Sequence, residues 1–355
     1  MKIIITGGAG FIGSALIRHL VQNTNNTIIN VDKITYAGNL ESLNDVDGSD
    51  RYFFERVDIC SKPDIERIFK KYLPDAIINL AAESHVDRSI ENPMDFINTN
   101  IVGVFNLLTI ANAYWKDLEK KKKNRFRFLH VSTDEVFGSL KDDGSLFNEL
   151  YPYSPRSPYS ASKASSDHLV RAWHHTYSLP TIITNCSNNY GPFHHPEKFI
   201  PHIILNALSG KPIPIYGDGL QIRDWLYVED HVRALMQVLN TAKPGSSYNI
   251  GGFNEKTNLD VVNKVCAVID EMFITQFNKE SSNTKDLIHF VQDRPGHDRR
   301  YAIDSSKISN ELGWKPVETF ESGIYKTIDW YINNSKWWEQ LLSDGYEFKR
   351  IGLVK

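Results

Sequence analysis

The apolar positions in the first half of the chain form short runs that alternate with longer amphipathic segments. The short runs predict buried strands over residues 2–6, 27–32, 51–57, 76–82, 126–131 and 181–186. The longer segments predict helices over residues 12–21, 63–72, 94–115 and 159–177. Strands that alternate with helices are typical of a parallel sheet with crossover connections, so we predict an α/β fold with a doubly wound, Rossmann-like parallel sheet.

A glycine-rich turn connects the first predicted strand to the first predicted helix. Gly7, Gly10 and Gly13 stand three apart in GGAGFIG, where glycines allow a tight turn and the close approach of a pyrophosphate to the helix N-terminus. The next strand ends in Asp32, nineteen residues after Gly13, where a carboxylate accepts hydrogen bonds from an adenosine ribose. Because that carboxylate would repel a 2′-phosphate, we predict NAD rather than NADP. Later strand ends are expected beside the adenine (Asp58, Ile59) and beside the nicotinamide half (Leu80, Ala81, Ala82).

The length of 355 residues exceeds that of one typical domain. After residue 186 the regular alternation weakens, and prolines and glycines become frequent. We therefore predict an NAD-binding domain at residues 1–187 and about 222–248, and a smaller α/β substrate-binding domain at about 188–221 and 249–355. Basic side chains in the loops of the smaller domain are candidate diphosphate ligands: Lys198, Arg223, Arg294 and His297.

Composition and charge narrow the function classes. A formal net charge of −3 and a pI near 6.5 argue against a nucleic-acid or membrane-surface protein, and we interpret the basic run Lys120–Lys123 as a solvated loop. Neither the three cysteines nor the histidine pairs at 174–175 and 194–195 have metal-site spacing, so we expect no metal and no disulfide framework. The N-terminal apolar run is too short for a signal peptide and no stretch approaches the length of a membrane span. We expect a cytoplasmic protein.

The predicted helix over residues 94–115 is apolar on more than one face. Such a helix is normally buried. Two interpretations stay open: burial against its own sheet, or pairing with the 159–177 helix in a homodimer interface.

The stretch from Leu129 to Lys163 contains the candidate chemistry. Tyr159 and Lys163 lie four residues apart and share one helix face. We therefore expect the ammonium to stabilise the phenolate and to lower the pKa of the phenol from its ordinary value of about 10. Thr133, at the end of a strand, can hydrogen-bond the same substrate hydroxyl. These three side chains can remove a proton from an alcohol while a hydride leaves its carbon. The Tyr-Lys spacing alone occurs by chance in many helices, and the glycine motif is what favours the catalytic interpretation.

These motifs resemble the extended short-chain dehydrogenase/reductase superfamily that acts on nucleotide sugars. Within it, the chain is similar over essentially its whole length to the dTDP-glucose 4,6-dehydratases, through LAAESHVDRSI, VSTDEVFG, SPYSASKASSDHLVRA and DRPGHDRRYAID. Asp134 and Glu135 decide the branch, because related epimerases have Ala-Thr there, UDP-glucuronate decarboxylases Ser-Glu and CDP-glucose dehydratases Asp-Lys. Phe137 departs from the family, which commonly has Tyr at that position.

The resemblance implies an NAD-dependent lyase for deoxysugar and cell-surface polysaccharide synthesis. Its catalytic residues would be Thr133, Asp134, Glu135, Tyr159 and Lys163, with Glu135 as the base at C5 of the sugar. Asp134 would be the acid at O6, its pKa raised by desolvation and by its carboxylate neighbour. Cofactor contacts would include, besides the glycines and strand ends, Phe11, Ile12, Lys33, Thr99 and Asn189. Substrate contacts would be Ser84, Thr133, Asn188, Lys198, Phe199, Pro214, Ile215, Tyr216, Arg223, Asn258, Asp293, Arg294 and His297.

Two other functions stay open at this point. One is another NAD-dependent nucleotide-sugar enzyme, such as a UDP-glucuronate decarboxylase or a dehydratase of a different nucleotide sugar. The other is a redox-sensing NAD-binding protein without the chemistry, which would not need Asp134, Glu135, Tyr159 and Lys163 together.

Overall fold

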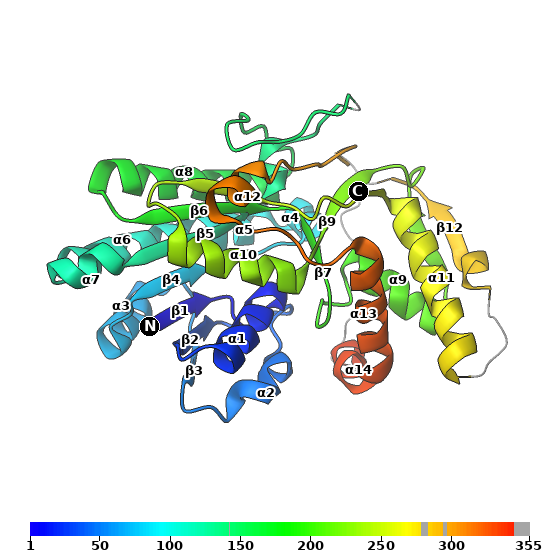
Figure 1. The fold of residues 1–355 in the computed structure, drawn as a ribbon, viewed down its shortest axis with the longest axis horizontal. Coiled ribbons are helices and arrows are strands. Elements are labelled where there is room, and N and C mark those ends of the chain that lie inside the picture. Colours follow the sequence, from blue (N-terminus) through cyan, green and yellow to red (C-terminus); the bar gives the residue numbers. More distant parts are fainter. Residues whose placement is uncertain (142, 278–282, 294–296, 344–355) are drawn as a thin grey trace.

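The computed structural model describes residues 1–141, 143–277, 283–293 and 297–343. A seven-stranded, wholly parallel sheet forms its larger part, in the order β10-β6-β5-β4-β1-β2-β3 (Figure 1). The prediction of a doubly wound Rossmann-like sheet is confirmed. Its strands are β1 (Lys2–Thr6), β2 (Thr27–Asp32), β3 (Tyr52–Arg56), β4 (Ala76–Asn79), β5 (Arg127–Thr133), β6 (Thr181–Cys186) and β10 (Ser247–Ile250).

Helices cover both faces of this sheet because successive side chains of a strand point to opposite faces. On β1, Ile3 and Ile5 belong to one apolar core and Ile4 to the other. The first core is closed by α1 (Phe11–Asn23), α10 (Val228–Thr241) and α12 (Ser306–Leu312). The second is closed by α3 (Lys62–Tyr72), α6 (Val104–Lys116) and α8 (Pro158–Tyr177).

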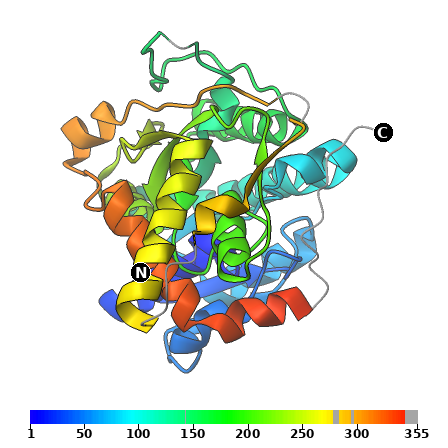
Figure 2. The same ribbon diagram turned by 90° about the vertical axis from the view of Figure 1, so that its right-hand side faces the viewer.

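The rest of the chain builds a smaller part, seen at the right of Figure 1 and facing the viewer in Figure 2. It contains a three-stranded sheet of β7 (Asn188–Tyr190), β9 (Ile222–Tyr227) and β11 (Glu255–Thr257), and a pair formed by β8 (Ile213–Tyr216) and β12 (Ile288–Val291). Its apolar core lies between α9 (Phe199–Leu208), α11 (Asn258–Phe277), α13 (Phe320–Asn333) and α14 (Ser335–Ser343). β9 lies in this part, whereas α10 and β10 return to the large sheet. The predicted domain bounds stay a prediction.

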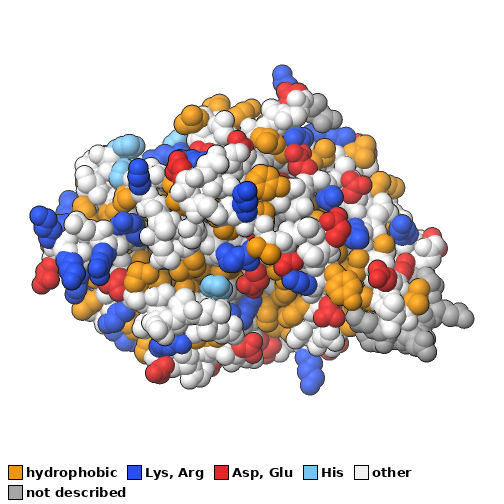
Figure 3. Space-filling view, in the orientation of Figure 1, with side chains coloured by type: hydrophobic (Ala, Val, Ile, Leu, Met, Phe, Trp, Pro, Cys, Tyr) orange, Lys and Arg blue, Asp and Glu red, His pale blue; other side chains and the backbone are white. Residues whose placement is uncertain are grey.

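Short helices connect these elements. They are α2 (Asn44–Asp47), α4 (Val86–Glu91), α5 (Pro93–Phe96), α7 (Lys120–Arg125), a π-helix (Ile97–Gly103) and 3-10 turns at Leu40–Leu43, Asp134–Phe137 and Thr284–Leu287. The interpretation of the basic run as a loop is wrong, because the run begins α7. Its side chains are nonetheless largely exposed, and Figure 3 shows basic groups gathered at that edge of the molecule.

One helical segment corrects the expectation about membrane spans. From Pro93 to Lys116, α5, the π-helix and α6 join into 24 residues that are long and apolar enough to cross a membrane by length and composition. Half of its most apolar window is buried inside the protein. The apolar side chains of α6 pack into the core on one face of the sheet. Burial within the protein therefore accounts for the apolar character of this segment.

Candidate active site

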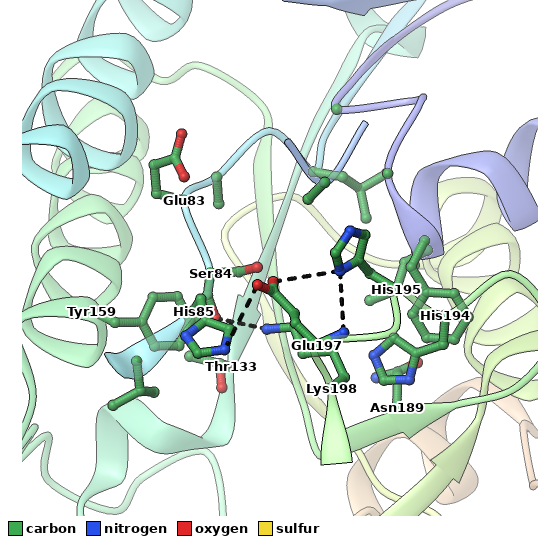
Figure 4. A pocket seen from close by; sticks show the side chains of 18 of the residues that line it. Glu83, Ser84, His85, Thr133, Tyr159, Asn189, His194, His195, Glu197 and Lys198 are labelled. Atoms are coloured by element: carbon green, nitrogen blue, oxygen red, sulfur yellow. Dashed lines mark hydrogen bonds and ion pairs between the residues drawn. The ribbon is translucent and has the colours of Figure 1, made fainter. Parts of the chain in front are cut away.

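A cavity of about 490 Å³ lies at the carboxyl ends of the large sheet's strands, between the two parts of the chain. Ligands of doubly wound sheets bind in this crevice. Its lining comes from the glycine turn, from the ends of β2, β4, β5 and β6, from α8, and from loops of the smaller part. Figure 4 shows the side chains at its centre.

At the glycine turn the backbone packs so closely that no side chain fits at two of the three glycines. Gly7 has φ +72°, and a Cβ atom there would lie 2.6 Å from the backbone nitrogen of Ala81. A Cβ at Gly13 would lie 2.2 Å from the carbonyl oxygen of Gly7. Gly10 begins α1 without a capping side chain, so the first N–H groups of the helix face the cavity without an internal acceptor. This cradle fits a pyrophosphate.

Asp32 ends β2 beside this cradle. One carboxylate oxygen accepts a hydrogen bond from Ala9 N at 2.9 Å and the other from Ile34 N at 2.8 Å. Burial raises the pKa of this carboxyl, and these two hydrogen bonds and the charge of Lys33 oppose the rise. Each oxygen retains a further lone pair, so the geometry fits a ribose diol.

Lys33 ties together the strand ends beside Asp32. Its Nζ lies 3.5 Å from Asp58 Oδ2 and 3.7 Å from Glu83 Oε1, and it donates to Thr99 Oγ1 at 3.2 Å. All residues that were predicted to contact the cofactor line the cavity: Gly7, Gly10, Phe11, Ile12, Gly13, Asp32, Lys33, Asp58, Ile59, Leu80, Ala81, Ala82, Thr99, Tyr159, Lys163 and Asn189.

The predicted substrate residues divide into two groups. Ten of them line the cavity: Ser84, Thr133, Asn188, Lys198, Phe199, Pro214, Tyr216, Arg223, Asn258 and His297. Ile215 does not, because on β8 it alternates with Pro214 and Tyr216 and its side chain enters the apolar core. Asp293 lies behind the cavity wall, 2.7 Å from Nδ1 of His297 and hydrogen-bonded by Gln221. Arg294 lies outside the described residues.

Thr133, Tyr159 and Lys163 meet at the end of β5. Tyr159 and Lys163 have only 9% and 4% of their surface exposed. The Lys163 ammonium donates to the carbonyl oxygen of Val131 at 2.8 Å. The expectation that the Tyr159 pKa lies below its ordinary value is wrong for this structure. Burial and the negative charge of Glu135 raise the pKa of the phenol well above its ordinary value, although a hydrogen bond with Thr133 opposes them.

The acidic pair follows directly in a 3-10 turn. Glu135 lines the cavity, and its backbone N–H donates to Thr133 Oγ1 at 3.2 Å. Asp134 lies below the cavity lining with 1% of its surface exposed, and its Oδ2 accepts no hydrogen bond from the described part of the chain. Burial, Glu135 and Asp224 raise the Asp134 pKa well above its ordinary value. The predicted direction of that pKa, and its two predicted causes, are confirmed.

Sequence reasoning missed a cluster around Glu197 that closes the cavity from the smaller part. Glu197 Oε2 lies 3.8 Å from His85 Nε2 (Figure 4) and 3.4 Å from Arg88 Nε, and its side chain is only 3% exposed. The Arg88 guanidinium stacks 3.7 Å from the ring of Tyr36, and burial, Lys198 and Arg88 lower the His195 pKa to about 3. The sequence assigns Lys198 to the diphosphate and gives the histidines at 194–195 no metal-site spacing, but it gives no role to Glu197. The available signal was this acid next to Lys198 and close to the two histidines.

His194 and Lys198, in the same loop as Glu197, hold this loop against the larger part of the chain. The ring of His194 stacks on Phe11 with 4.1 Å between centroids, and Lys198 Nζ donates to the carbonyl oxygen of Ser84 at 3.2 Å. Both contacts join the smaller part to elements of the large sheet. The cavity therefore has walls from both parts of the chain.

This geometry can be compared with known proteins. Residues 4–327 match the model of a family described as GDP-mannose 4,6 dehydratase. The chain belongs to this family. A dTDP-glucose 4,6-dehydratase of Neisseria meningitidis serogroup B is 59% identical over 100% of this chain and 99% of its own length. The dTDP-glucose 4,6-dehydratase 1 of Escherichia coli K12 is 60% identical over 98% and 97% of the two chains.

A solved family member has the same fold. The crystal structure of a dTDP-glucose 4,6-dehydratase from Streptomyces venezuelae, with NAD and TYD bound, has a TM-score of 0.85 and 40% identity to this chain. The match covers 96% of this chain and 100% of that one. These likenesses confirm the resemblance that the motifs indicate.

Proposed function

We propose that the protein is an NAD-dependent lyase that converts dTDP-glucose to dTDP-4-keto-6-deoxyglucose and water. One observation supports this above the others: the Asp134–Glu135 pair stands beside Tyr159 and Lys163 at a single strand end. An oxidoreductase needs only the Tyr-Lys pair, whereas an elimination also needs an acid and a base. The relatives that are about 60% identical over the whole chain are named for this reaction.

NAD is the cofactor. Gly7 and Gly13 let the turn pack closely without side chains, Gly10 leaves the start of α1 without a capping side chain, where its pyrophosphate would bind, and Asp32 lines the cavity where the ribose would lie. When bound, NAD takes a hydride from C4 of the sugar and returns it to C6 later in the same turnover. No external redox partner is then consumed, so we expect the cofactor to stay bound between turnovers.

The first step assigned to the chain is removal of the proton from the C4 hydroxyl. Tyr159 is the acceptor, and Thr133 holds the hydroxyl against the phenol. The ammonium of Lys163, buried on the same helix face, stabilises the phenolate as it forms. Since burial and Glu135 raise the Tyr159 pKa, this stabilisation is needed at neutral pH.

The second step is elimination of water across C5 and C6. Oxidation at C4 makes the C5 proton acidic, because the carbanion is conjugated with the new carbonyl. Glu135, which lines the cavity, takes that proton. The C6 hydroxyl leaves only after protonation, and we assign this proton to Asp134, which its raised pKa keeps protonated. At the end a proton from Glu135 returns to C5, Tyr159 releases the proton that it took from the C4 hydroxyl, and Asp134 takes up a proton in place of the one that left with the water.

The nucleotide would lie against the smaller part. Tyr216 offers an aromatic face to the base, and Lys198, Arg223 and His297 offer positive charge or N–H donors to the diphosphate. The Arg223 guanidinium is held by the carbonyl oxygens of Ile222 at 2.7 Å and Asp298 at 2.9 Å. This fixed position supports a role in binding.

We also propose a cytoplasmic homodimer. The helix from Pro93 to Lys116 buries one face in the core, and its large exposed apolar side chains are Met94, Ile97, Val102 and Phe105. Phe105 packs edge-on against Trp173 of α8, with 5.7 Å between centroids, so the two helices form one surface. A second copy would cover it symmetrically. Phe105→Glu should convert dimers to monomers in sedimentation, and a wild-type monomer would contradict the proposal.

The test of the function is incubation of the purified protein with dTDP-glucose and no added NAD, followed by mass spectrometry. We expect loss of one water from the nucleotide sugar. Loss of carbon dioxide from UDP-glucuronate instead would indicate a decarboxylase. No change in either sugar, with NAD present in the protein, would contradict an enzymatic function.

A further inference from the structure

α8 carries a third polar residue in line with Tyr159 and Lys163. Asp167 lies four residues after Lys163, so the three side chains share one helix face. Asp167 is completely buried, and its side chain does not line the cavity. Any effect of Asp167 on the site therefore passes through neighbouring side chains.

Polar groups from three elements converge on the Asp167 carboxylate. Oδ2 accepts hydrogen bonds from the Tyr153 hydroxyl at 2.8 Å and from Asn185 Nδ2 at 3.2 Å. Oδ1 lies 3.4 Å from Nε2 of His130 on β5. A carboxylate that faces several donors is stabilised in its ionised form. Burial alone would raise the Asp167 pKa, but the contacts with His130, Lys163 and Tyr153 lower it below its ordinary value.

The contact with His130 does not neutralise this charge. Asn79 accepts from Thr6 Oγ1 through Oδ1 at 2.6 Å, so its Nδ2 is the atom that donates to His130 Nδ1 at 2.9 Å. The imidazole proton consequently lies on Nε2, which donates to Ser166 Oγ at 3.2 Å, and Asp167 Oδ1 accepts no hydrogen bond from the described part of the chain. Burial and the charge of Lys163 lower the His130 pKa to about 4, so the ring is neutral. The negative charge of Asp167 needs another partner.

Lys163 is the positive group that this charge can balance. Its ammonium is buried and donates to the uncharged carbonyl of Val131. A buried ammonium without a compensating charge tends to lose its proton. Burial does lower the Lys163 pKa, and the charges of Asp167 and Cys186 oppose that effect.

Asp167 is also connected to the catalytic strand end. The side-chain amide of Asn185, on β6, donates both to Asp167 and to the carbonyl oxygen of Thr133 at 3.1 Å. β5 and β6 are neighbours in the sheet, so this link crosses directly between them. The position of the Thr133 backbone thus depends on the same carboxylate.

We infer that Asp167 is a positioning residue for the reaction: it supplies the buried negative charge that keeps Lys163 protonated behind Tyr159, and through Asn185 it fixes the strand end that carries Thr133. The inference rests on the proposed function, in which Lys163 assists the oxidation of C4. It assigns no contact between Asp167 and substrate or cofactor.

The charge has a measurable consequence for pH dependence. The ionisable groups around the Asp167–Lys163 pair are His130 from β5, Cys186 from β6, Tyr159 from α8, and Tyr153, whose hydroxyl also accepts from Arg171 at 2.8 Å. Removing one negative charge lowers the pKa of the groups that it faces. Both limbs of the pH profile of kcat should therefore move to lower pH.

The experiment compares purified enzymes with their bound cofactor, acting on dTDP-glucose. Asp167→Asn should shift both limbs downward by about one pH unit, with KM within about twofold because Asp167 does not line the cavity. Asp167→Glu keeps the charge and should restore the profile. Tyr153→Phe is the matched control, because it removes one hydrogen bond to the same carboxylate and leaves the charge. Its profile should stay in place.

An unchanged pH profile in Asp167→Asn would overturn the inference even if kcat fell. A rise in KM with kcat unchanged would also overturn it. A double-mutant cycle gives an answer that does not need turnover. Lys163→Met and Asp167→Asn should each lower Tm, and the double variant should be more stable than the sum of the two losses predicts. Additive losses would overturn the charge–charge coupling between Lys163 and Asp167. Wild-type protein without turnover would contradict the proposed function instead, whatever the cycle shows.

Discussion

Asp134 and Asp167 are both buried, yet the protein around them favours opposite charge states. Asp134, after β5, has Glu135 and Asp224 as neighbours, and its pKa rises well above its ordinary value. Asp167, on the inner face of α8, faces donors from Tyr153 and Asn185, and its pKa falls. Burial penalises the charge of both, so the neighbouring groups decide. The surroundings of Asp134 keep it protonated for the elimination, and the surroundings of Asp167 keep it ionised.

The largest expected effect comes from removing the acidic pair while leaving Asp167 in place. Asp134→Asn with Glu135→Gln should lower formation of the deoxysugar on the order of 10⁴-fold, since both proton transfers are lost. Thr133 and Tyr159 remain, so oxidation of C4 should survive. Mixing with dTDP-glucose should give a lasting reduced-nicotinamide absorbance. Normal product formation with normal solvent exchange at C5 would rule out both carboxylates.

Tyr159→Phe should stop the reaction one step earlier. The ring still packs, but the group that takes the C4 proton is gone, and turnover should fall by about 10² to 10⁴. In contrast to the double amide variant, no reduced nicotinamide should accumulate after mixing. Stopped-flow absorbance distinguishes the two variants. Near-normal turnover would show that another group removes the proton.

Stability should respond with opposite signs at the two aspartates. Asp134 has a raised pKa in the folded state, so its ionisation in the unfolded chain lowers stability as pH rises above about 4. Asp134→Asn removes that loss and should raise Tm at pH 7 by about 2 °C or more. Asp167 has a lowered pKa, so its contribution is present above about pH 4 and disappears as pH falls through the folded pKa.

Asp167→Asn should therefore lower Tm at pH 7, and the difference from wild type should shrink in acid. Removal of one member of a buried charge pair costs about 3 to 5 kcal/mol. Scanning calorimetry from about pH 2 to pH 8 measures both variants. Shifts of the same sign for Asp134→Asn and Asp167→Asn would refute the contrast.

The smallest expected effect concerns a third carboxylate, Asp32, which is partly buried and lines the cavity. Two backbone N–H groups hold it in place, and its charge disfavours a 2′-phosphate. Asp32→Asn should keep the fold and weaken the preference for NAD over NADP on the order of tenfold. Cofactor released by denaturation, separated by chromatography, gives the ratio. A wild-type pool composed mostly of NADP would contradict the assignment.

The fold and the cofactor cradle could be predicted because their signals are local. Gly7, Gly10 and Gly13 encode a turn through backbone sterics alone, and strand ends of a parallel sheet meet at one edge wherever the chain continues. β1, β2 and β6 lie where their apolar runs predict them. The predicted strand over 76–82 ends earlier, at Asn79, because the chain there turns into the cavity.

The remaining features depend on contacts between distant segments. Successive side chains of β8 point to opposite sides, so Ile215 points into the core while Tyr216 lines the cavity. The sequence does not show which of these two side chains faces the cavity. The Tyr159 pKa depends on Glu135 and on burial, which helix spacing does not show. The roles of Glu197 and Asp167 likewise depend on side chains more than thirty residues away in the sequence, such as Arg88 and His130.

The most direct test of the proposed mechanism follows the hydrogen that leaves C4. dTDP-glucose carrying deuterium at C4 would be incubated with the protein in ordinary water, without added NAD, and the product examined by NMR and mass spectrometry. Internal return by a bound cofactor predicts a 4-keto-6-deoxy product with that deuterium at C6 and none at C5. A product without deuterium at C6, or unchanged substrate with the deuterium still at C4, would contradict the account.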